Sequence, residues 1–176
     1  MESDTHFTSI GAYLQVLHTL NVQQKIVGVQ FINMGRRSED DRFGLQILYS
    51  GSLEGTTISM NSFYKSNYRC IVIEGSANIT VSDNVGVNNV GHCIYTGPRA
   101  RDNIIRNNYV SDTMAISWNE RVAGSSDYHA AAFYNWNGPN SYSDNIAVGS
   151  RYYGFYCYND WQVRLEVSFL NLLSLL

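Results

Sequence analysis

A short amide or hydroxyl residue followed by an apolar residue recurs along this chain, and this repetition most limits the folds open to it. The pair is clearest as Asn84-Val85 in SDNVGVN, and similar pairs occur 22 positions upstream and 24 positions downstream. Across the chain the other pairs are Gln30-Phe31, Ser62-Phe63, Asn108-Tyr109 and Asn145-Ile146. Asparagine disfavours a helix because its side chain competes for backbone hydrogen bonds. Repetition near a fixed period is instead typical of a solenoid, in which each unit stacks on the next.

Each pair is followed by a turn and a second short apolar run, so the chain divides into about five imperfect units of two short strands. The runs are FGLQIL (43–48), CIVIEG (70–75), CIYTG (93–97), MAISW (114–118) and YGFYCY (153–158). Short strands between Gly, Asn and Ser turns also occur in β-sandwiches. The connections are too short for Greek-key crossovers, however, and no helical segment is available for βαβ units. We therefore predict an all-β fold, a parallel β-helix of about five imperfect coils, since a coil of three short strands needs about this many residues.

The asparagines and the apolar residues have separate tasks in such a coil. Coils stack at the inter-strand spacing of about 4.8 Å, so equivalent side chains form ladders. An asparagine at a bend can adopt the left-handed conformation and bond its amide to the asparagines above and below. Cys70 and Cys93 open matching runs. We expect them to stack inside as small buried groups, with a disulfide between them as the alternative.

Three segments follow from this pattern. Residues 1–25 are an N-terminal lead-in or partial coil, in which YLQVLHTL has some helical period. Residues 26–160 carry the β-helix repeats, and residues 161–176 form a divergent apolar tail or cap without an Asn turn. A solenoid needs a polar cap at its end. Because the tail is apolar, we expect a fragment of a longer solenoid.

The composition fits a β-rich and often extracellular protein. Charged residues make up 15% of the 176 residues, and the formal net charge is −3. Without a basic excess, a nucleic-acid partner is not expected. The N-terminal sequence lacks a basic region followed by an apolar run, so no signal peptide is predicted. Only ten residues follow Glu166, whereas a membrane-spanning helix needs about 20.

Three phrases of the chain, in order, resemble a known family. They are NMGRRSEDDRFGLQILYSG, RCIVIEGSANITVSDNVGVNNVGHCIY and AAAFYNWNGPNSYSDNIAVGSRYYGFYCY, within residues 26–158. They resemble the parallel β-helix repeat region of fibrocystin, fibrocystin-L and the cell-surface and secreted hyaluronan-degrading proteins. The resemblance implies a right-handed β-helix, extracellular or at the cell surface, in a large and often membrane-anchored protein. For some members it also implies binding or cleavage of hyaluronan.

This sequence departs from the family at one informative place. Family members often carry a histidine-rich strand after the NMG phrase, whereas the matching run 42–48, RFGLQIL, contains no histidine. The module that usually precedes the repeats is also not seen. If the histidines serve catalysis or metal binding in the family, this chain lacks them.

Three residues are candidates for catalysis. Asp40 and Asp41 lie in a charged turn between two strands and could form an acid/base or calcium pair on a substrate groove. The alternative is a solvated loop. His92 is the third candidate, with a turn histidine bonded to neighbouring backbone as its alternative. We predict no metal centre and no cofactor, with calcium as the one open exception.

Four residues are candidates for ligand binding. Arg69 and Tyr153 hold, in other coils, the position of His92, and a ladder of the three on an outer face could hold an acidic sugar. Trp136 and Tyr153 belong to the most aromatic part of the chain and could stack on sugar rings. The alternative is that these rings fill a wide coil and protect its edge. Asn78-Ile79-Thr80 is a glycosylation sequon placed at a coil bend.

Together these features favour an extracellular carbohydrate- or matrix-binding module, with a polysaccharide such as hyaluronan or a cell-surface molecule as ligand. The rest of a larger chain is the other expected partner. One alternative is a polysaccharide-degrading enzyme, a hydrolase or lyase, and another is a structural spacer of a large surface protein. An enzyme should place two acids within about 10 Å of each other across a groove. A binding module should instead present exposed aromatic side chains in a row.

Overall fold

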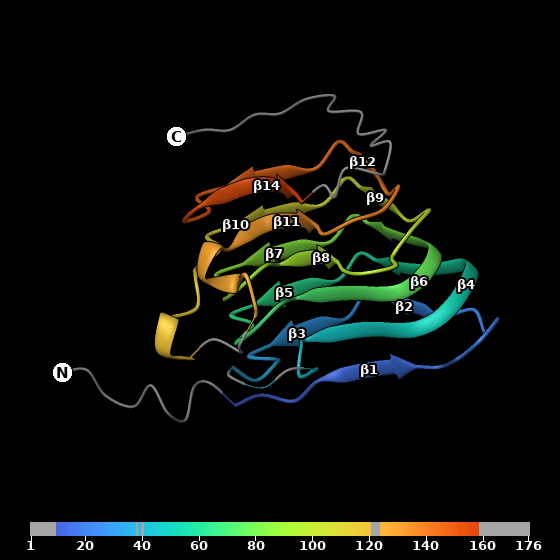
Figure 1. The fold of residues 1–176 in the computed structure, drawn as a ribbon, viewed down its shortest axis with the longest axis horizontal. Helices are drawn as coiled ribbons and strands as arrows, with labels where there is room; N and C mark the ends of the chain where they lie inside the picture. The colour runs from blue at the N-terminus through green and yellow to red at the C-terminus, as the bar shows by residue number, and fades with distance from the viewer. Residues whose placement is uncertain (1–9, 38, 40, 121–123, 159–176) are drawn as a thin grey trace.

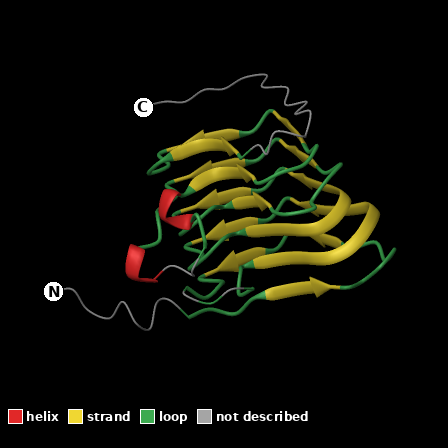
Figure 2. Ribbon diagram, in the orientation of Figure 1, coloured by secondary structure: helices red, strands yellow, loops and turns green. Residues whose placement is uncertain are grey.

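The protein is a parallel β-helix, seen in a computed structural model that describes residues 10–37, 39, 41–120 and 124–158. All strand pairs within the described residues are parallel. The strands stack in layers with loops at the corners (Figures 1 and 2). Each coil contributes a strand to each of three faces, and the last described strand begins a sixth coil. The prediction of a parallel β-helix of about five coils is confirmed, with three strands per coil rather than two.

The first two faces are continuous because the two longest strands bend around the corner between them. β4 (Leu45–Ser59) and β6 (Ile71–Ser82) run along both faces, which therefore form one nine-stranded sheet. The first face is completed by β1 (Leu14–Leu17), β8 (Ile94–Thr96), β11 (Ala131–Asn135) and β14 (Tyr153–Cys157). The second is completed by β2 (Lys25–Val27), β9 (Ile104–Arg106) and β12 (Ser141–Ser143).

The third face is a separate five-stranded sheet with one strand from each coil. Its strands are β3 (Gln30–Ile32), β5 (Ser62–Tyr64), β7 (Val85–Val87), β10 (Tyr109–Ser111) and β13 (Ile146–Val148). Val85, Tyr109 and Ile146 occupy one register column, as the repeat predicts. In the second coil, however, the partner of Val85 is Ser62 and not Phe63. The pair Ser62-Phe63 was therefore assigned one position out of phase, because Phe63 points inward where Gly86 stands in the next coil.

A buried column of asparagines forms the corner before the third face. The side-chain oxygens of Asn84, Asn108 and Asn145 each accept hydrogen bonds from the backbone N–H and the side-chain amide of the preceding asparagine in the column, at 2.9–3.0 Å. The members are Asn61, Asn84, Asn108 and Asn145. The left-handed conformation belongs to the residues immediately before them, Met60, Asp83, Asn107 and Asp144. The predicted asparagine ladder exists. The asparagines make its hydrogen bonds, whereas the residue before each asparagine adopts the left-handed conformation that turns the corner.

The interior is a continuous apolar column in which like residues stack. Phe31 lies on Phe63, and Phe133 on Phe155, with ring centroids 4.7 Å apart in both pairs. Cys70 and Cys93 are both buried in this column, as expected. They form a disulfide, with their Cα atoms 4.6 Å apart. The structure thus shows the disulfide that was the alternative, and not two separate thiols. The disulfide covalently joins the third coil to the fourth.

Two local predictions were wrong. The segment YLQVLHTL forms a strand and not a helix, since β1 pairs with Leu45–Leu48 and belongs to the first coil. The run MAISW (114–118) is not the first-face strand of its coil, because β11 occupies that place. The tail at 161–176 lies outside the described residues.

Candidate ligand-binding site

A long excursion between β10 and β11 covers the outer side of the first face. It carries two short 3₁₀ helices, η2 (Trp118–Glu120) and η3 (Asp127–His129). Beneath it, side chains that point out of the sheet form a second apolar cluster, separate from the interior. Its fully buried members are Phe43, Leu48, Tyr68, Val72, Val90, Tyr95, Ile116, Ala131 and Tyr134. The first face is therefore buried on both sides along this part of the helix.

Asp127 anchors the excursion to the sheet. Its carboxylate accepts two hydrogen bonds from Arg69 Nε at 3.1 Å and one from Arg69 Nη2 at 2.6 Å. It also accepts one from the His92 backbone N–H at 2.8 Å and further ones from the hydroxyls of Tyr68 and Ser125. Asp127 is fully buried and Arg69 is 6% exposed. A buried carboxylate with this many donors is fully satisfied, as buried charges must be.

The electrostatics keep this pair ionised. Burial alone would raise the pKa of Asp127, but the Arg69 guanidinium outweighs it and holds that pKa well below its usual range. Burial alone would lower the pKa of Arg69, and Asp127 outweighs it in the opposite direction. The guanidinium also lies over the Tyr95 ring, 3.9 Å from its centroid. Each charge is thus stabilised by the other, and the Arg69 cation is stabilised further by the face of the Tyr95 ring.

His92 is neutral and holds a defined tautomer. Its Nδ1 accepts a hydrogen bond from the Ala131 backbone N–H at 3.0 Å, so the proton resides on Nε2, which lies 2.9 Å from Ser126 Oγ. Burial lowers the pKa of His92 to about 4. The 3.8 Å separation between Nε2 and Asp127 Oδ1 is therefore not an ion pair at neutral pH.

His92 should make the folded protein less stable as the pH falls from about 6.5 to about 4. In this window the unfolded chain binds a proton that the folded chain does not, since the pKa falls from 6.5 to about 4 on folding. The stabilisation is complete above pH 6.5, and about 3 kcal/mol is lost across the window. Urea unfolding at several pH values measures this. In the His92→Asn variant the amide oxygen can still accept the Ala131 N–H, but the side chain does not titrate. The slope of its unfolding free energy against pH should therefore be smaller, by up to about one proton taken up on unfolding. Equal slopes for the two proteins would contradict the assignment.

Next to η3 of the excursion lies a cavity of about 260 Å³, here called the aromatic cavity. The rings of Tyr134 and Tyr156 stack with their centroids 5.1 Å apart, and those of Trp136 and Tyr158 lie beside them, tilted against each other with centroids 5.2 Å apart. The complete lining is Gly124, Ser125, Ser126, Tyr128, His129, Tyr134, Trp136, Tyr153, Tyr156 and Tyr158. Pockets for drug-sized ligands span about 300–1,000 Å³. The aromatic cavity is slightly smaller, which suits one ring of a longer ligand.

A family model described as the CEMIP β-helix matches residues 9–164. The chain belongs to this family. The fold agrees with the match, and the predicted resemblance to the hyaluronidase-family β-helix is confirmed.

The CEMIP β-helix of this chain also has curated relatives in Dictyostelium discoideum. A G8 domain-containing protein is 29% identical over 163 residues, which are 84% of this chain and 14% of that protein. Communication mutant protein F is 30% identical over 165 residues, again 84% of this chain and 14% of that protein. The chain thus spans about 14% of the length of these relatives. No solved structure matches it.

The predicted ligand-binding residues separate into a buried pair and an exposed pair. Register places Arg69, His92 and Tyr153 in one column, with Ala131 between the last two. The prediction of an outer ladder of all three is nevertheless wrong, because the excursion covers Arg69 and His92, and His92 is 0% exposed. Tyr153, which is 39% exposed, and Trp136 both line the aromatic cavity of this CEMIP β-helix.

The structure describes two of the three predicted catalytic residues, Asp41 and His92. Asp40 lies outside the described residues. Asp41 sits in the turn before β4, where its carbonyl accepts a hydrogen bond from Gln46 Nε2 at 2.9 Å. His92 is enclosed and neutral, so it is not placed to meet a substrate. Among the described residues, no group of three or more His, Cys, Asp or Glu side chains could hold a metal ion.

Sequence reasoning missed the excursion and its anchor. Asp127, Ser125 and Ser126 come from a stretch without an Asn turn, and no repeat position predicts them. One signal was available: the step from Asn108 to Asn145 is 37 residues, against 24 for the step before it. The extra residues mark an insertion in that coil.

No helix in the described part of the chain is long and apolar enough to cross a bilayer.

Proposed function

We propose that this CEMIP β-helix is an extracellular carbohydrate-binding module, and that the aromatic cavity holds a sugar ring of a polysaccharide. The row of tyrosine and tryptophan rings around the cavity carries the proposal. Aromatic faces pack against the C–H faces of sugars, while tyrosine hydroxyls offer hydrogen bonds to sugar hydroxyls. A hyaluronan-like polymer is the first ligand to test, because the family includes hyaluronan-degrading proteins.

The cysteine chemistry supports an extracellular location. Disulfides form and persist in oxidising compartments and are rare in the cytosol. The Cys70–Cys93 disulfide lies between two coils in the interior, where both side chains are at most 1% exposed. Asn78 of the sequon is exposed at a corner, where its amide donates to Ser52 Oγ at 2.7 Å. A glycan at Asn78 would point to solvent, and it belongs to this proposal.

Binding without cleavage fits the charges around the cavity better than catalysis does. A glycosidase needs two carboxyl groups flanking the scissile bond, one of them able to give up a proton. Among the described residues that line the aromatic cavity, none has an acidic side chain. The carboxylate beneath it, Asp127, is fully buried, and Arg69 keeps it ionised. It is therefore a structural anion and not a proton donor.

Removing a cavity ring should weaken polysaccharide binding. We expect Trp136→Ala and Tyr153→Ala each to raise the dissociation constant for size-defined hyaluronan at least tenfold, as loss of a central aromatic contact typically does. Tyr109→Ala is the matched control for Tyr153→Ala, because both tyrosines are 39% exposed and Tyr109 lies on the third face. Calorimetry or affinity electrophoresis provides the measurement.

Incubating the protein with size-defined hyaluronan separates the rival functions, if both the retention of the polymer and its chain length are measured. Retention without shortening of the polymer supports a binding module, and shortening would instead show an enzyme. Equal affinity of Tyr153→Ala and Tyr109→Ala would place any binding elsewhere on the surface. Neither retention nor shortening, over a panel of acidic and neutral polysaccharides, would leave the structural spacer as the function.

A further inference from the structure

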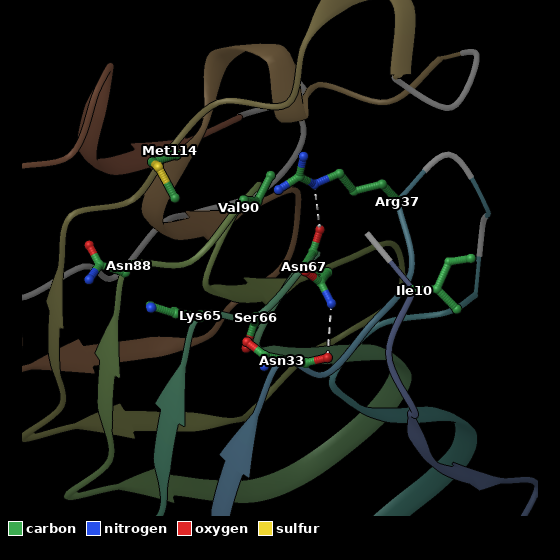
Figure 3. Close-up of a pocket in the computed structure, with 9 residues that line it drawn as sticks. All are labelled: Ile10, Asn33, Arg37, Lys65, Ser66, Asn67, Asn88, Val90 and Met114. Carbon is green, nitrogen blue, oxygen red and sulfur yellow. Dashed lines mark hydrogen bonds between the residues drawn. The ribbon is translucent and has the colours of Figure 1, made fainter. Parts of the chain in front are cut away.

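A second and larger cavity lies below the excursion, at the corner that follows the third face. Its volume is about 520 Å³, and none of its lining residues is shared with the aromatic cavity. The lining consists of Ile10, Asn33, Arg37, Lys65, Ser66, Asn67, Asn88, Val90 and Met114 (Figure 3). We call it the basic cavity, because its described lining residues include two cations, Arg37 and Lys65, and no acidic side chain.

The repeat places amides and a lysine side by side in this cavity. Asn33, Lys65 and Asn88 are the corner residues of three successive coils, with left-handed φ angles of 53°, 54° and 57°. Their backbones are joined coil to coil, since Asn33 N donates to Tyr64 O and Lys65 N donates to Val87 O. Equivalent positions in neighbouring coils are about 4.8 Å apart. A ligand along this corner would therefore meet an ammonium group flanked by two carboxamides.

Arg37 is held over the cavity by the protein itself. Its Nε donates to the Asn67 carbonyl at 3.3 Å, and the Asn67 amide donates to the Asn33 carbonyl at 2.9 Å (Figure 3). Nη1 lies 3.6 Å from the Glu120 carboxylate of η2, whose side chain is 37% exposed. An ion pair of this length and exposure is weak. The guanidinium is thus oriented by its contact with the Asn67 carbonyl, and an incoming anion would compete with Glu120 for it.

One buried polar group in the lining has no partner. Ser66 is 1% exposed, and its hydroxyl makes no hydrogen bond to any described residue. Buried polar groups are almost always paired. A hydroxyl left without a partner beside two cations is a donor available to an anion.

We propose that the basic cavity binds the oxyanion of an acidic polysaccharide, a carboxylate or a sulfate. Arg37 supplies charge-assisted hydrogen bonds, Lys65 supplies a second positive charge, and Ser66 and the Asn88 amide supply neutral donors. The ligand's identity rests on the proposed function, but the chemistry of the cavity does not. The net charge of −3 makes a polyanion unlikely to bind by general attraction, so a local pair of cations has to select it.

The test compares native hyaluronan with its carboxyl-reduced form, which lacks the charge, and with a polymer that carries sulfate groups in addition to carboxylates. Hyaluronan, chondroitin sulfate and hyaluronan with its carboxyl groups reduced to alcohols are titrated against the unaltered protein and its variants. We expect Arg37→Gln to weaken hyaluronan binding about tenfold, the factor of a weak charge-assisted hydrogen bond, and Lys65→Gln about threefold. Binding of the reduced polymer should not change in either variant. Chondroitin sulfate carries both carboxylates and sulfates, so tighter binding of chondroitin sulfate than of hyaluronan indicates a sulfate, and binding of hyaluronan that is as tight or tighter indicates a carboxylate.

Two further variants keep the test specific. Glu120→Gln removes the competitor of the anion, so it should tighten hyaluronan binding about two- to threefold, which a loss of folding would not do. Arg106→Gln removes one positive charge from an exposed residue of β9 and is the charge-matched control. An equal loss in Arg106→Gln and Arg37→Gln would show attraction by net charge alone and overturn the inference.

The outcomes for the unaltered protein separate this inference from the proposed function. If reduced and native hyaluronan bind equally well, the proposed function holds and the basic cavity is not an anion site. If native hyaluronan binds and the Arg37→Gln variant loses affinity while Trp136→Ala does not, the basic cavity is the site and the aromatic cavity is not. If none of the three polymers binds, both proposals fail.

Discussion

Replacing Asp127 with asparagine is expected to lower the free energy of unfolding by about 3–5 kcal/mol, the usual effect of removing one partner of a buried ion pair. Asparagine keeps the shape of the side chain and removes its charge. Arg69, which is 6% exposed and donates three hydrogen bonds to this carboxylate, would then be a buried cation without a counter-charge. Chemical denaturation at pH 7 gives the change in free energy directly.

A paired replacement distinguishes an uncompensated charge from lost packing. In the double variant Arg69→Met/Asp127→Leu both charges are absent, and apolar pairs of similar volume often replace buried ion pairs without loss. We expect this variant to be more stable than Asp127→Asn alone. If it is equally unstable, the hydrogen bonds to His92 N, Tyr68 and Ser125 matter more than the charge.

The same substitution should also reach the aromatic cavity. Asp127 is the first residue of η3, and Gly124, Ser125 and Ser126 just before it line the cavity. Once the anchor is lost, this wall is no longer fixed to the sheet. Sugar affinity should therefore fall in Asp127→Asn even at temperatures where the coils remain folded, and hydrogen exchange of 124–130 should rise selectively.

Truncating a central asparagine of the ladder should destabilise the whole β-helix. In Asn108→Ala, the backbone N–H and amide of Asn84 lose their acceptor, and the Oδ1 of Asn145 loses the side-chain donor. The carbonyl of Val81 loses a donor as well. Each buried group left unpaired costs about 1–3 kcal/mol. We expect a loss of about 3–5 kcal/mol, close to the whole stability of many domains.

The matched control for this prediction is an asparagine outside the ladder. Asn119 is exposed in η2, so Asn119→Ala should change the free energy of unfolding by less than about 0.5 kcal/mol. Thermal and urea unfolding of both variants provide the comparison. A loss under about 1 kcal/mol in Asn108→Ala would mean that the ladder turns the corner without stabilising it.

How far the sequence predicted this protein depended on whether a residue repeats. Asn84, Asn108 and Asn145 recur with apolar neighbours, and the structure stacks them as predicted. Errors appeared where the repeat was irregular: Phe63 was assigned one position out of phase, and MAISW was assigned to the sheet although β11 takes its place. Phe63 is an inward-facing core residue that lies opposite a glycine of the next coil, so the apolar pattern shifts by one position there. MAISW belongs to the excursion, because apolar side chains also occur in covering segments.

The candidate site was predicted in part for the same reason. Trp136 and Tyr153 do line one cavity, since both lie on strand positions or directly beside them. Arg69 and His92 were assigned to the correct column but were expected to be exposed, whereas the excursion covers both side chains. A register argument gives the direction of a side chain, and it does not reveal what packs over it.

The sequence by itself determined the stack of coils, because each coil contacts its neighbours through equivalent positions, and the repeat therefore specifies both partners of each contact. The tertiary structure alone decided what the outer surface presents. Asp127 meets Arg69 across 58 residues of chain, a contact that no period predicts, and it turns a column of polar residues into a buried anchor. The two cavities beside that excursion depend on its path, which is fixed by long-range packing and one ion pair.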